Sequence, residues 1–472
     1  MMAQKETPPA AIASEGLTSS ARGLWVGQRV LRKGLLDALV ELDRRHGSEG
    51  MDLIPFSLFG RRAYLAVHPQ HIGAVLHDTE GFKRAELFLR PFEDALGFNA
   101  VTVPADQWQT VRQRTLRFLS GKALKGYEEI MTRTLEEDTV PAWRRASAGG
   151  GAIDLFDGML DYASKVVFSA FLGIPKESVP AHLHRTLSRI FDLVRKRVFS
   201  FVGIPPWVPT ADNREFRARR GEVYRFIESH LDRSVDGDSM LGALVRAHSE
   251  AGVLDKKRLL EEMLGNLIGG SETTIILLVW TLHFLAHDPT LQERLHRELA
   301  EHRFDTHGLP RTSLLHRCLT ESLRIRSPSY LAARESVRPV RVGDVERPAR
   351  AHVIASQYIT HNDPRVWSEP DRFDPDRFSR RPPRSTKDCS DFFPFGGGRN
   401  VCSGQAYAYQ EAALALSCLL KHFRLRPGSP FDIGIRPELT LRPEKPAKAF
   451  VEERAGSEKV NSTWKEPAIR ST

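Results

Sequence analysis

The stretch Phe395-Gly396-Gly397-Gly398-Arg399-Asn400-Val401-Cys402-Ser403-Gly404 is the most informative part of this chain. Three consecutive glycines allow backbone conformations that other residues resist, and they let a flat ligand approach the main chain closely. Cys402 follows this turn and precedes an apolar segment, residues 405–423, that predicts a helix. Because a helix N-terminus stabilises negative charge, the sequence predicts that Cys402 is presented as a thiolate.

This segment resembles the haem-binding loop of the cytochrome P450 family, in which a cysteine thiolate is the axial ligand of haem iron. The resemblance covers about residues 50–450 and implies an α+β, mainly α fold, with a helix-rich body and a small β-sheet region. The haem, a haem b, is expected between a long central helix and the helix that follows the cysteine. The implied metal ligand is Cys402, and the loop residues implied in cofactor binding are Phe395, Arg399, Asn400 and Gly404.

The composition indicates a soluble globular protein, since 41% of the 472 residues are hydrophobic and 27% are charged. We expect a disordered segment at 1–22, a single P450 domain at 23–452 and a polar tail at 453–472. Residues 1–20 lack the apolar core of a secretory signal, and the strongest apolar run, 275–286, is too short to span a bilayer. A cytoplasmic protein without a transmembrane anchor is therefore expected.

The chain carries a formal net charge of +9 and four cysteines. Its basic residues are spread along the whole length without an aromatic-interleaved stripe, so we expect no nucleic-acid partner. A basic docking face for an acidic electron-transfer protein is the better interpretation, and a solvated basic surface stays open for most individual residues. The cysteines show no CxxC pairing and no zinc spacing, and Cys318 and Cys418 are predicted to be small core residues.

Residues 256–287 predict a long, buried helix that contains Gly269-Gly270-Ser271-Glu272-Thr273-Thr274. Two glycines in mid-helix cost about 1 kcal/mol each, and a buried carboxylate costs more, so the segment predicts room for a ligand. It resembles the central helix of the P450 family, which passes over the distal haem face. By that resemblance Thr273 hydrogen-bonds iron-bound dioxygen and Glu272 relays protons. A glycine kink in a packed helix is the alternative.

Glu321 and Arg324 form a Glu-x-x-Arg pair on a predicted helix, where Glu321 shares the apolar stripe and needs a cationic partner. The P450 family carries this pair, joined by an arginine from a later loop. Here that loop reads Phe373-Asp374-Pro375-Asp376-Arg377-Phe378, so Arg377 is the third member of a structural triad.

Haem propionates need cations, and arginine suits this role because its fork binds a carboxylate at two points. Trp108 and Arg112 form a Trp-x-x-x-Arg pair on one helical face, and they resemble the family's propionate contacts, as does Arg334. Asn400 departs from the family, which most often has Arg or His at that position. This departure puts one propionate contact in doubt and slightly favours a non-oxygenating branch.

Two segments beside the haem are expected to line an apolar substrate pocket, which fits a lipophilic substrate. One is the lid region 82–103, and the other follows residue 330; each phenylalanine of the lid either lines the pocket or packs the loop. The pocket residues we expect are Phe82, Phe88, Phe92, Leu267, Gly270, Leu331, Ala332 and Leu439.

The resemblance implies a monooxygenase that inserts one atom of O2 into a hydrophobic molecule, by hydroxylation or epoxidation, in secondary metabolism. We expect a monomer that receives NAD(P)H-derived electrons from a separate ferredoxin or flavodoxin and its reductase, with Arg114, Lys122, Lys125 and Arg399 as docking cations. An isomerase or dehydratase needing no external electrons is one alternative. A haem sensor or carrier without turnover is another.

Several strands are also predicted from alternation and turn residues. Residues 53–58 and 63–67 form a hairpin, which a short helix at 69–76 follows. Strands are expected at 337–342 and 353–358, and residues 371–384 form a loop. A last hairpin is expected from residues 439–441 and 448–451.

Overall fold

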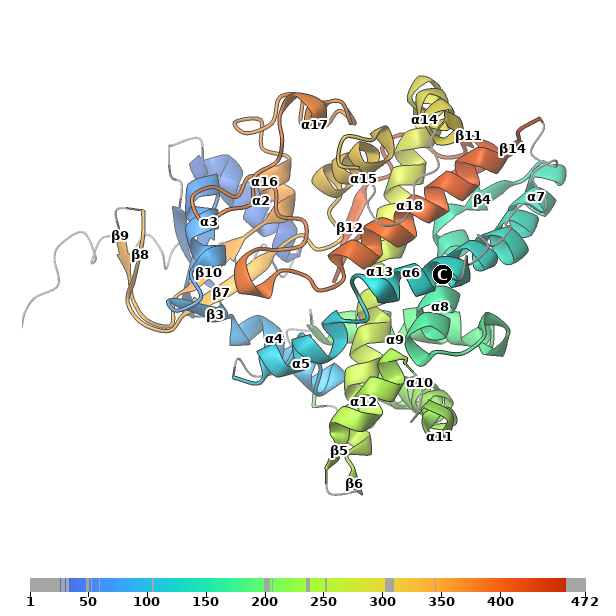
Figure 1. Ribbon diagram of the computed structural model, residues 1–472. Helices are drawn as coiled ribbons and strands as arrows, with labels where there is room; N and C mark the ends of the chain where they lie inside the picture. Colours follow the sequence, from blue (N-terminus) through green and yellow to red (C-terminus); the bar gives the residue numbers. More distant parts are fainter. Residues whose placement is uncertain are drawn as a thin grey trace, which may run out of the picture.

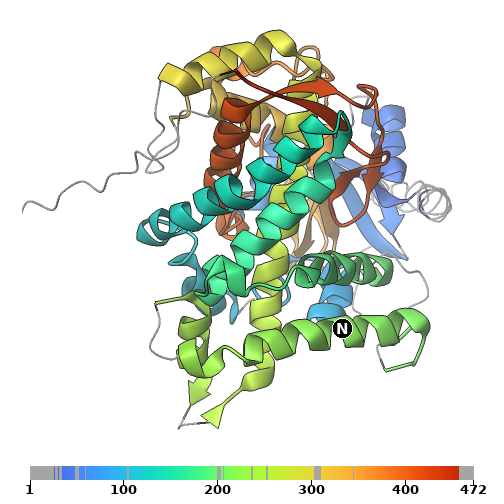
Figure 2. The same ribbon diagram turned by 90° about the vertical axis from the view of Figure 1, so that its right-hand side faces the viewer.

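The central element is helix α13 (Lys256–His287), which crosses the whole molecule in the computed structural model (Figures 1 and 2). The structure describes residues 34–47, 51, 53–58, 60–103, 106–198, 204–205, 207–234, 238–250, 253–301, 310–343 and 345–455, with Val26 and Val30. The Asp255 side chain caps α13 by accepting the Arg258 N–H. The predicted bounds 256–287 are confirmed. The residues expected to be disordered, 1–22, lie outside the described part.

Helices pack around α13 as a large body with one apolar core. Helices α8 and α18 lie directly against it. The elements of this body are α4 (Glu86–Leu96), α5 (Trp108–Leu116), α6 (Lys122–Thr134), the π-helical turn η2 (Leu135–Thr139), α7 (Val140–Ala148), α8 (Leu155–Leu172), η3 (Lys176–Ser178), α9 (His182–Val198), α10 (Ala211–Glu228), α11 (Leu231–Ser234), α12 (Met240–His248), β5 (Ser249–Glu250), β6 (Val253–Leu254), α14 (Pro289–Glu301), α15 (Leu314–Ile325) and α18 (Gln405–His422).

A five-stranded sheet lies on one side of this body, at the left of Figure 1. Its strands, in spatial order, are β1 (Leu53–Leu58), β2 (Arg61–Ala66), β10 (His352–Ala355), β7 (Ala332–Ser336) and β3 (Phe82–Arg84). Nearby are α2 (Leu35–His46), α3 (Pro69–His77), α16 (Gln357–His361) and the hairpin of β8 (Val340–Val342) and β9 (Val345–Arg347). The predicted hairpin at 53–67 and the helix after it are confirmed.

Three of the strand predictions need correction. The strand expected at 337–342 begins only at Val340, as β8. The strand expected at 353–358 ends at Ala355, because the Ser356 hydroxyl caps α16. The expected pairing of 439–441 with 448–451 is wrong. Instead β13 (Leu441–Pro443) pairs with β12 (Ile435–Pro437), and β14 (Lys448–Glu453) joins β11 (Phe423–Pro427) and β4 (Ala152–Asp154). The loop at 371–384 contains one short helix, α17 (Arg377–Arg380).

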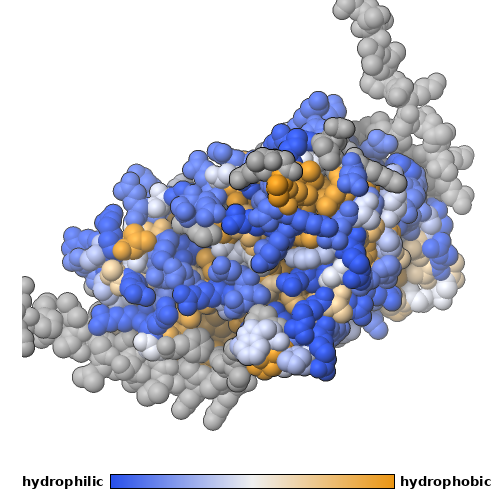
Figure 3. Space-filling view, turned by 90° about the horizontal axis from the view of Figure 1, so that it is seen from below, coloured by the Kyte–Doolittle hydropathy of each residue, from blue (hydrophilic) through white to orange (hydrophobic). Residues whose placement is uncertain are grey.

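Helix α13 is the one described helix that is long and apolar enough to cross a membrane, and most of it is buried inside the protein. The predicted core run 275–286 is buried throughout, which is typical of a core helix. In contrast to this apolar core, the face of the protein drawn in Figure 3 is mainly hydrophilic, with separate apolar patches.

Candidate active site

The loop from Phe395 to Gly404 presents Cys402 just before α18 begins. Gly396 and Gly398 have φ angles of 75° and 63°, which only glycine adopts readily. The Cys402 N–H donates to the Phe395 carbonyl oxygen at 2.9 Å and closes the turn. Gly404 is the N-cap residue of α18. The glycines therefore do what the sequence predicted: they fold the chain back so that one thiol is offered at a helix start.

The Cys402 side chain is exposed, yet it lies deep enough that burial raises its pKa. The Gly404 N–H and the Arg112 charge oppose the rise. The helix start and Arg112 therefore do not offset the effect of burial on this thiol, and a metal ion bound at Cys402 would favour the thiolate form.

Trp108 and Arg112 lie against this loop from α5. One Arg112 nitrogen donates to the Val401 carbonyl oxygen at 2.5 Å and to Ser403 Oγ at 3.1 Å. The guanidinium groups of Arg112 and Arg399 lie 5.1 Å and 5.7 Å from the centre of the Trp108 ring. The predicted Trp-x-x-x-Arg pair thus reaches the Cys loop, where Arg112 also holds the backbone beside Cys402.

Arg334 on β7 is buried, and its strand neighbour across the β3–β7 pair is Arg84. Burial lowers the pKa of each arginine to about 10, and Arg334 adds to the effect on Arg84. Neither guanidinium forms an ion pair with a carboxylate among the described residues. Arg84 also donates to the Ala100, Val101 and Val103 carbonyl oxygens and so anchors the lid segment. The sequence analysis missed Arg84, which no motif marks.

The two glycines of α13 have opposite surroundings. A methyl group added at Gly269 would meet no atom within 4 Å. One added at Gly270 would lie 2.9 Å from Val167 and 3.0 Å from Phe171. The prediction that Gly270 lines the pocket is therefore wrong, since it faces α8. Thr273, one turn after Gly269, donates to the Gly269 carbonyl oxygen at 3.0 Å and shares the open face.

Glu272 is buried on the other side of α13. Its Oε1 accepts from Arg442 Nε at 2.7 Å and from the Thr440 hydroxyl at 3.3 Å. Arg442 on β13 also donates to Asp192 of α9 at 3.0 Å. Burial raises the pKa of Glu272, while Arg442 opposes the rise. Arg442 is a second residue that sequence reasoning missed, because it lies 170 residues away from its partner.

Glu411 on α18 is a third buried carboxyl group, and sequence reasoning did not single it out. Burial raises its pKa well above the usual range, and the Thr274 and Tyr407 hydroxyls oppose this. This carboxyl group therefore lies inside the protein between α13 and α18, where burial favours its neutral form and the two hydroxyls favour its charged form.

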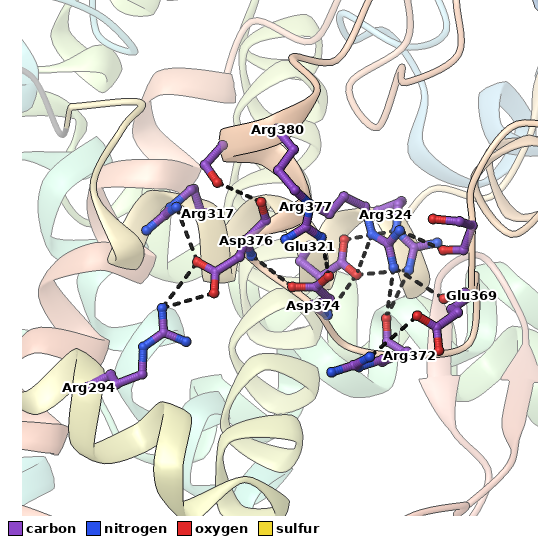
Figure 4. A network of polar contacts seen from close by, with 12 residues as sticks. Arg294, Arg317, Glu321, Arg324, Glu369, Arg372, Asp374, Asp376, Arg377 and Arg380 are labelled. Atoms are coloured by element: carbon purple, nitrogen blue, oxygen red, sulfur yellow. Dashed lines mark hydrogen bonds and ion pairs between the residues drawn. The ribbon is translucent and has the colours of Figure 1, made fainter.

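The structural triad is assembled as the sequence predicts (Figure 4). Glu321 accepts from Arg324 Nε at 2.8 Å and from Arg377 Nε at 3.2 Å, and all three side chains are buried. The Asp374 N–H donates to the same carboxylate at 3.0 Å. Arg324 and Arg377 donate further to backbone carbonyls of residues 361–372. The triad therefore fastens the segment that precedes the Cys loop.

Apart from Gly270, the residues expected in the substrate pocket divide into two groups. Two of them are core residues, which corrects the prediction: Leu267 has no exposed surface and packs in the main core, and Phe82 packs against the sheet. Both belong to regular elements whose apolar faces are covered. The remaining five are half-buried: Phe88, Phe92, Leu331, Ala332 and Leu439.

The residues around Cys402 fit a haem group. A flat ligand needs a glycine-lined approach, which the Cys loop and the open side of Gly269 offer. Its two propionates need cations, and Arg84 and Arg334 are buried arginines without a carboxylate partner among the described residues. Buried charge of this kind is expensive unless a ligand neutralises it. The donor set therefore agrees with a dianionic, iron-bearing ring at Cys402.

Comparisons with known proteins agree. The family model described as "Cytochrome P450" matches residues 23–450. "Cyclooctat-9-en-7-ol 5-monooxygenase" of Streptomyces melanosporofaciens is 28% identical over 80% of this chain and 83% of that protein. "Pentalenene oxygenase" of Streptomyces avermitilis is 25% identical over 83% of this chain and 86% of its own length.

The crystal structure of a cytochrome P450 named CYP102L1 has a TM-score of 0.75 at 17% identity, covering 89% of this chain and 97% of that one, and it shows the fold alone. The relatives are oxygenases, so the isomerase alternative is not favoured. The family implies a haem held by a cysteine thiolate, a redox partner and a hydrophobic substrate. This chain belongs to the cytochrome P450 family and is a haem-thiolate monooxygenase of the α+β, mainly α P450 fold.

Proposed function

We propose that this enzyme oxidises a lipophilic terpenoid in secondary metabolism, with Cys402 as the haem ligand. The names of the two relatives above, which act on terpenoid substrates, support the substrate class. The half-buried apolar residues Phe88, Leu331 and Leu439 suit such a substrate because they bring no charge to it. A monomer in the cytoplasm, with one domain at 23–452, completes the proposal.

The observation that supports the proposal is that two polar residues of α13, Thr273 and Glu272, lie on opposite sides of the helix. Thr273 offers a hydroxyl on the face that Gly269 leaves open, while Glu272 lies behind the helix with a counter-ion. Bound haem supplies the oxygen-activating chemistry through its iron and thiolate. Thr273 Oγ1 holds a hydrogen bond on that face. Glu272 accepts from Arg442 and from the Thr440 hydroxyl, and the guanidinium favours the charged form of this carboxyl group.

Electrons are proposed to enter from the side of α18 that faces away from α13. A groove of about 2680 Å³ lies there, lined by Phe395 to Gly398, the outer face of α18 and α6. Its basic side chains suit an acidic ferredoxin or flavodoxin. They are Lys125, Arg133, Arg144, Arg311, Arg317 and Lys421. Arg114, which the sequence suggested for docking, instead pairs with the buried Glu262 at 3.6 Å.

The first test is the absorption spectrum of the dithionite-reduced protein with carbon monoxide. The strongly red-shifted Soret band of a thiolate ligand is expected for the unaltered protein. Cys402→Ala should lose that band, and the matched Cys418→Ala variant, altered on the helix that follows the Cys loop, should keep it. If the red-shifted band persists in Cys402→Ala and disappears in Cys418→Ala, the haem ligand is Cys418 and our assignment of Cys402 is wrong.

The second test follows coupling in reconstituted turnover with a terpenoid that shifts the haem spin state. Thr273→Ala should retain haem but divert most reductant to peroxide, and Thr273→Ser, which keeps the hydroxyl, should restore product formation. Thr281→Val is the control, because that threonine is buried on the same helix and donates to the Leu277 carbonyl oxygen. Unchanged coupling in Thr273→Ala would remove this residue from the mechanism.

A further inference from the structure

Three side chains of different donor type converge at the far end of α18. They are Cys418 and His422, one turn apart on that helix, and Glu136 on the π-helical turn η2. Cys418 Sγ lies 3.6 Å from Glu136 Oε1, and His422 Nε2 lies 3.2 Å from Glu136 Oε2. One possible ligand atom from each of the three residues lies within 4.8 Å of those of the other two.

The sulfur–oxygen and nitrogen–oxygen separations, each to a different oxygen of Glu136, are close to two of the edges of a tetrahedral metal site. Metal–ligand distances of about 2.3 Å to sulfur and about 2.0 Å to nitrogen or oxygen give sulfur–oxygen edges of about 3.5 Å and nitrogen–oxygen edges of about 3.3 Å. The two carboxylate oxygens of Glu136 each lie beside one of the other donors, so a small rotation of this exposed side chain completes the arrangement.

The cluster is separate from the site at Cys402. Cys418 lies sixteen positions after Cys402, and sixteen positions along a helix span about 24 Å. The spacing Cys-x-x-x-His supplies two ligands from one face of α18, and the third comes from an element about 280 residues earlier. That is why the sequence showed no zinc motif. The π-helical turn widens the backbone at Glu136, as such turns often do at functional sites.

The donor types select the ion. A thiolate, an imidazole and a carboxylate suit Zn²⁺, whereas Mg²⁺ and Ca²⁺ prefer oxygen ligands. Two negative ligands would balance the charge of a divalent cation in this half-buried place. The groove described above also reaches Glu136, Cys418 and His422, so the fourth position opens to water or to a small ligand.

We propose that Glu136, Cys418 and His422 form a binding site for a zinc-like divalent cation. The bound ion joins the C-terminal end of α18 to η2 and the helices on either side of it, α6 and α7. Since α18 begins directly after the Cys loop, the ion braces the helix that follows the proposed haem ligand. Its open coordination position faces the groove, as in metal sites that keep three protein ligands and one exchangeable one.

The test is Zn²⁺ binding to the haem-loaded, full-length protein, measured by equilibrium dialysis and elemental analysis, with zinc K-edge absorption spectroscopy. One Zn²⁺ per chain is expected, with one sulfur ligand at about 2.3 Å and nitrogen or oxygen ligands at about 2.0 Å. Because loss of a direct ligand costs more than loss of an outer partner, Cys418→Ser and Glu136→Gln should each weaken binding by more than about 100-fold.

Two controls keep the test decisive. Cys389→Ser removes the other half-buried cysteine, far from the cluster in sequence, and should leave the affinity unchanged. Glu136→Gln alters an exposed residue, so its result does not depend on core packing. Absence of binding, a zinc spectrum without sulfur, or equal affinity in all the variants would mean an adventitious ion only and would overturn the proposal. None of these readouts depends on turnover.

Discussion

Replacing Glu321 with glutamine removes the negative charge that two buried guanidinium groups share. Arg324 and Glu321 have no exposed side-chain surface, and Arg377 is 7% exposed. The glutamine keeps the shape and one acceptor oxygen, but its amide group presents N–H donors where a second acceptor stood. Both arginines keep carbonyl partners from residues 361–372, yet they lose the carboxylate with which both form ion pairs.

The magnitude follows from this burial. Removing one partner of a buried ion pair leaves an uncompensated charge and costs about 3–5 kcal/mol. Surface pairs behave differently, and the same network offers one for comparison. Arg372 lies 3.4 Å from Glu369, with side chains 66% and 70% exposed, so Arg372→Gln should cost no more than about 1 kcal/mol. The predicted difference between the two variants is therefore several kcal/mol.

The assay is denaturant unfolding of haem-loaded protein, followed by far-ultraviolet circular dichroism and by the Soret band. Glu321→Gln should unfold at a much lower denaturant concentration, with the Soret band lost early because the triad fastens the segment before the Cys loop. Added salt should change the Arg372→Gln result more than the Glu321→Gln result. If the two variants unfold within about 1 kcal/mol of each other, the triad does not hold the fold as argued.

Three further outcomes are expected. Burial lowers the pKa of His361 to about 3, and its neutral ring accepts the Phe393 N–H at 2.9 Å, near the Cys loop. The free energy of unfolding should therefore fall by up to about 5 kcal/mol as the pH drops from about 6.5 towards 3. In pH-dependent unfolding, His361→Gln should remove most of this loss of stability in acid. Gly270→Ala should lower the melting temperature, because overpacking against α8 by about 1–3 kcal/mol exceeds the helix gain of about 1 kcal/mol, whereas Gly269→Ala should not lower it. Arg334→Leu should speed haem transfer to apomyoglobin by about 10-fold or more, and the exposed Arg338→Leu should leave the rate unchanged.

Local patterns determined much of this protein. The glycine-rich turn and the apolar run after Cys402 predicted a thiol at a helix start, and the structure places both there. The stretch after Asp255 predicted α13 with nearly its observed bounds, because a long apolar run behind a capping residue is typical of a buried helix. Glu321 and Arg324 were paired correctly because residues three apart on a helix lie side by side.

Only the tertiary structure determined which face of each helix or strand packs against the core. Gly269 and Gly270 are adjacent in sequence, and only the packing of α8 shows that the second faces the core. Arg84, Arg442 and Glu136 meet their partners across long stretches of chain, so no spacing could reveal them. A periodicity specifies that a residue is buried or exposed, whereas the neighbour it meets is set by how whole helices and strands pack.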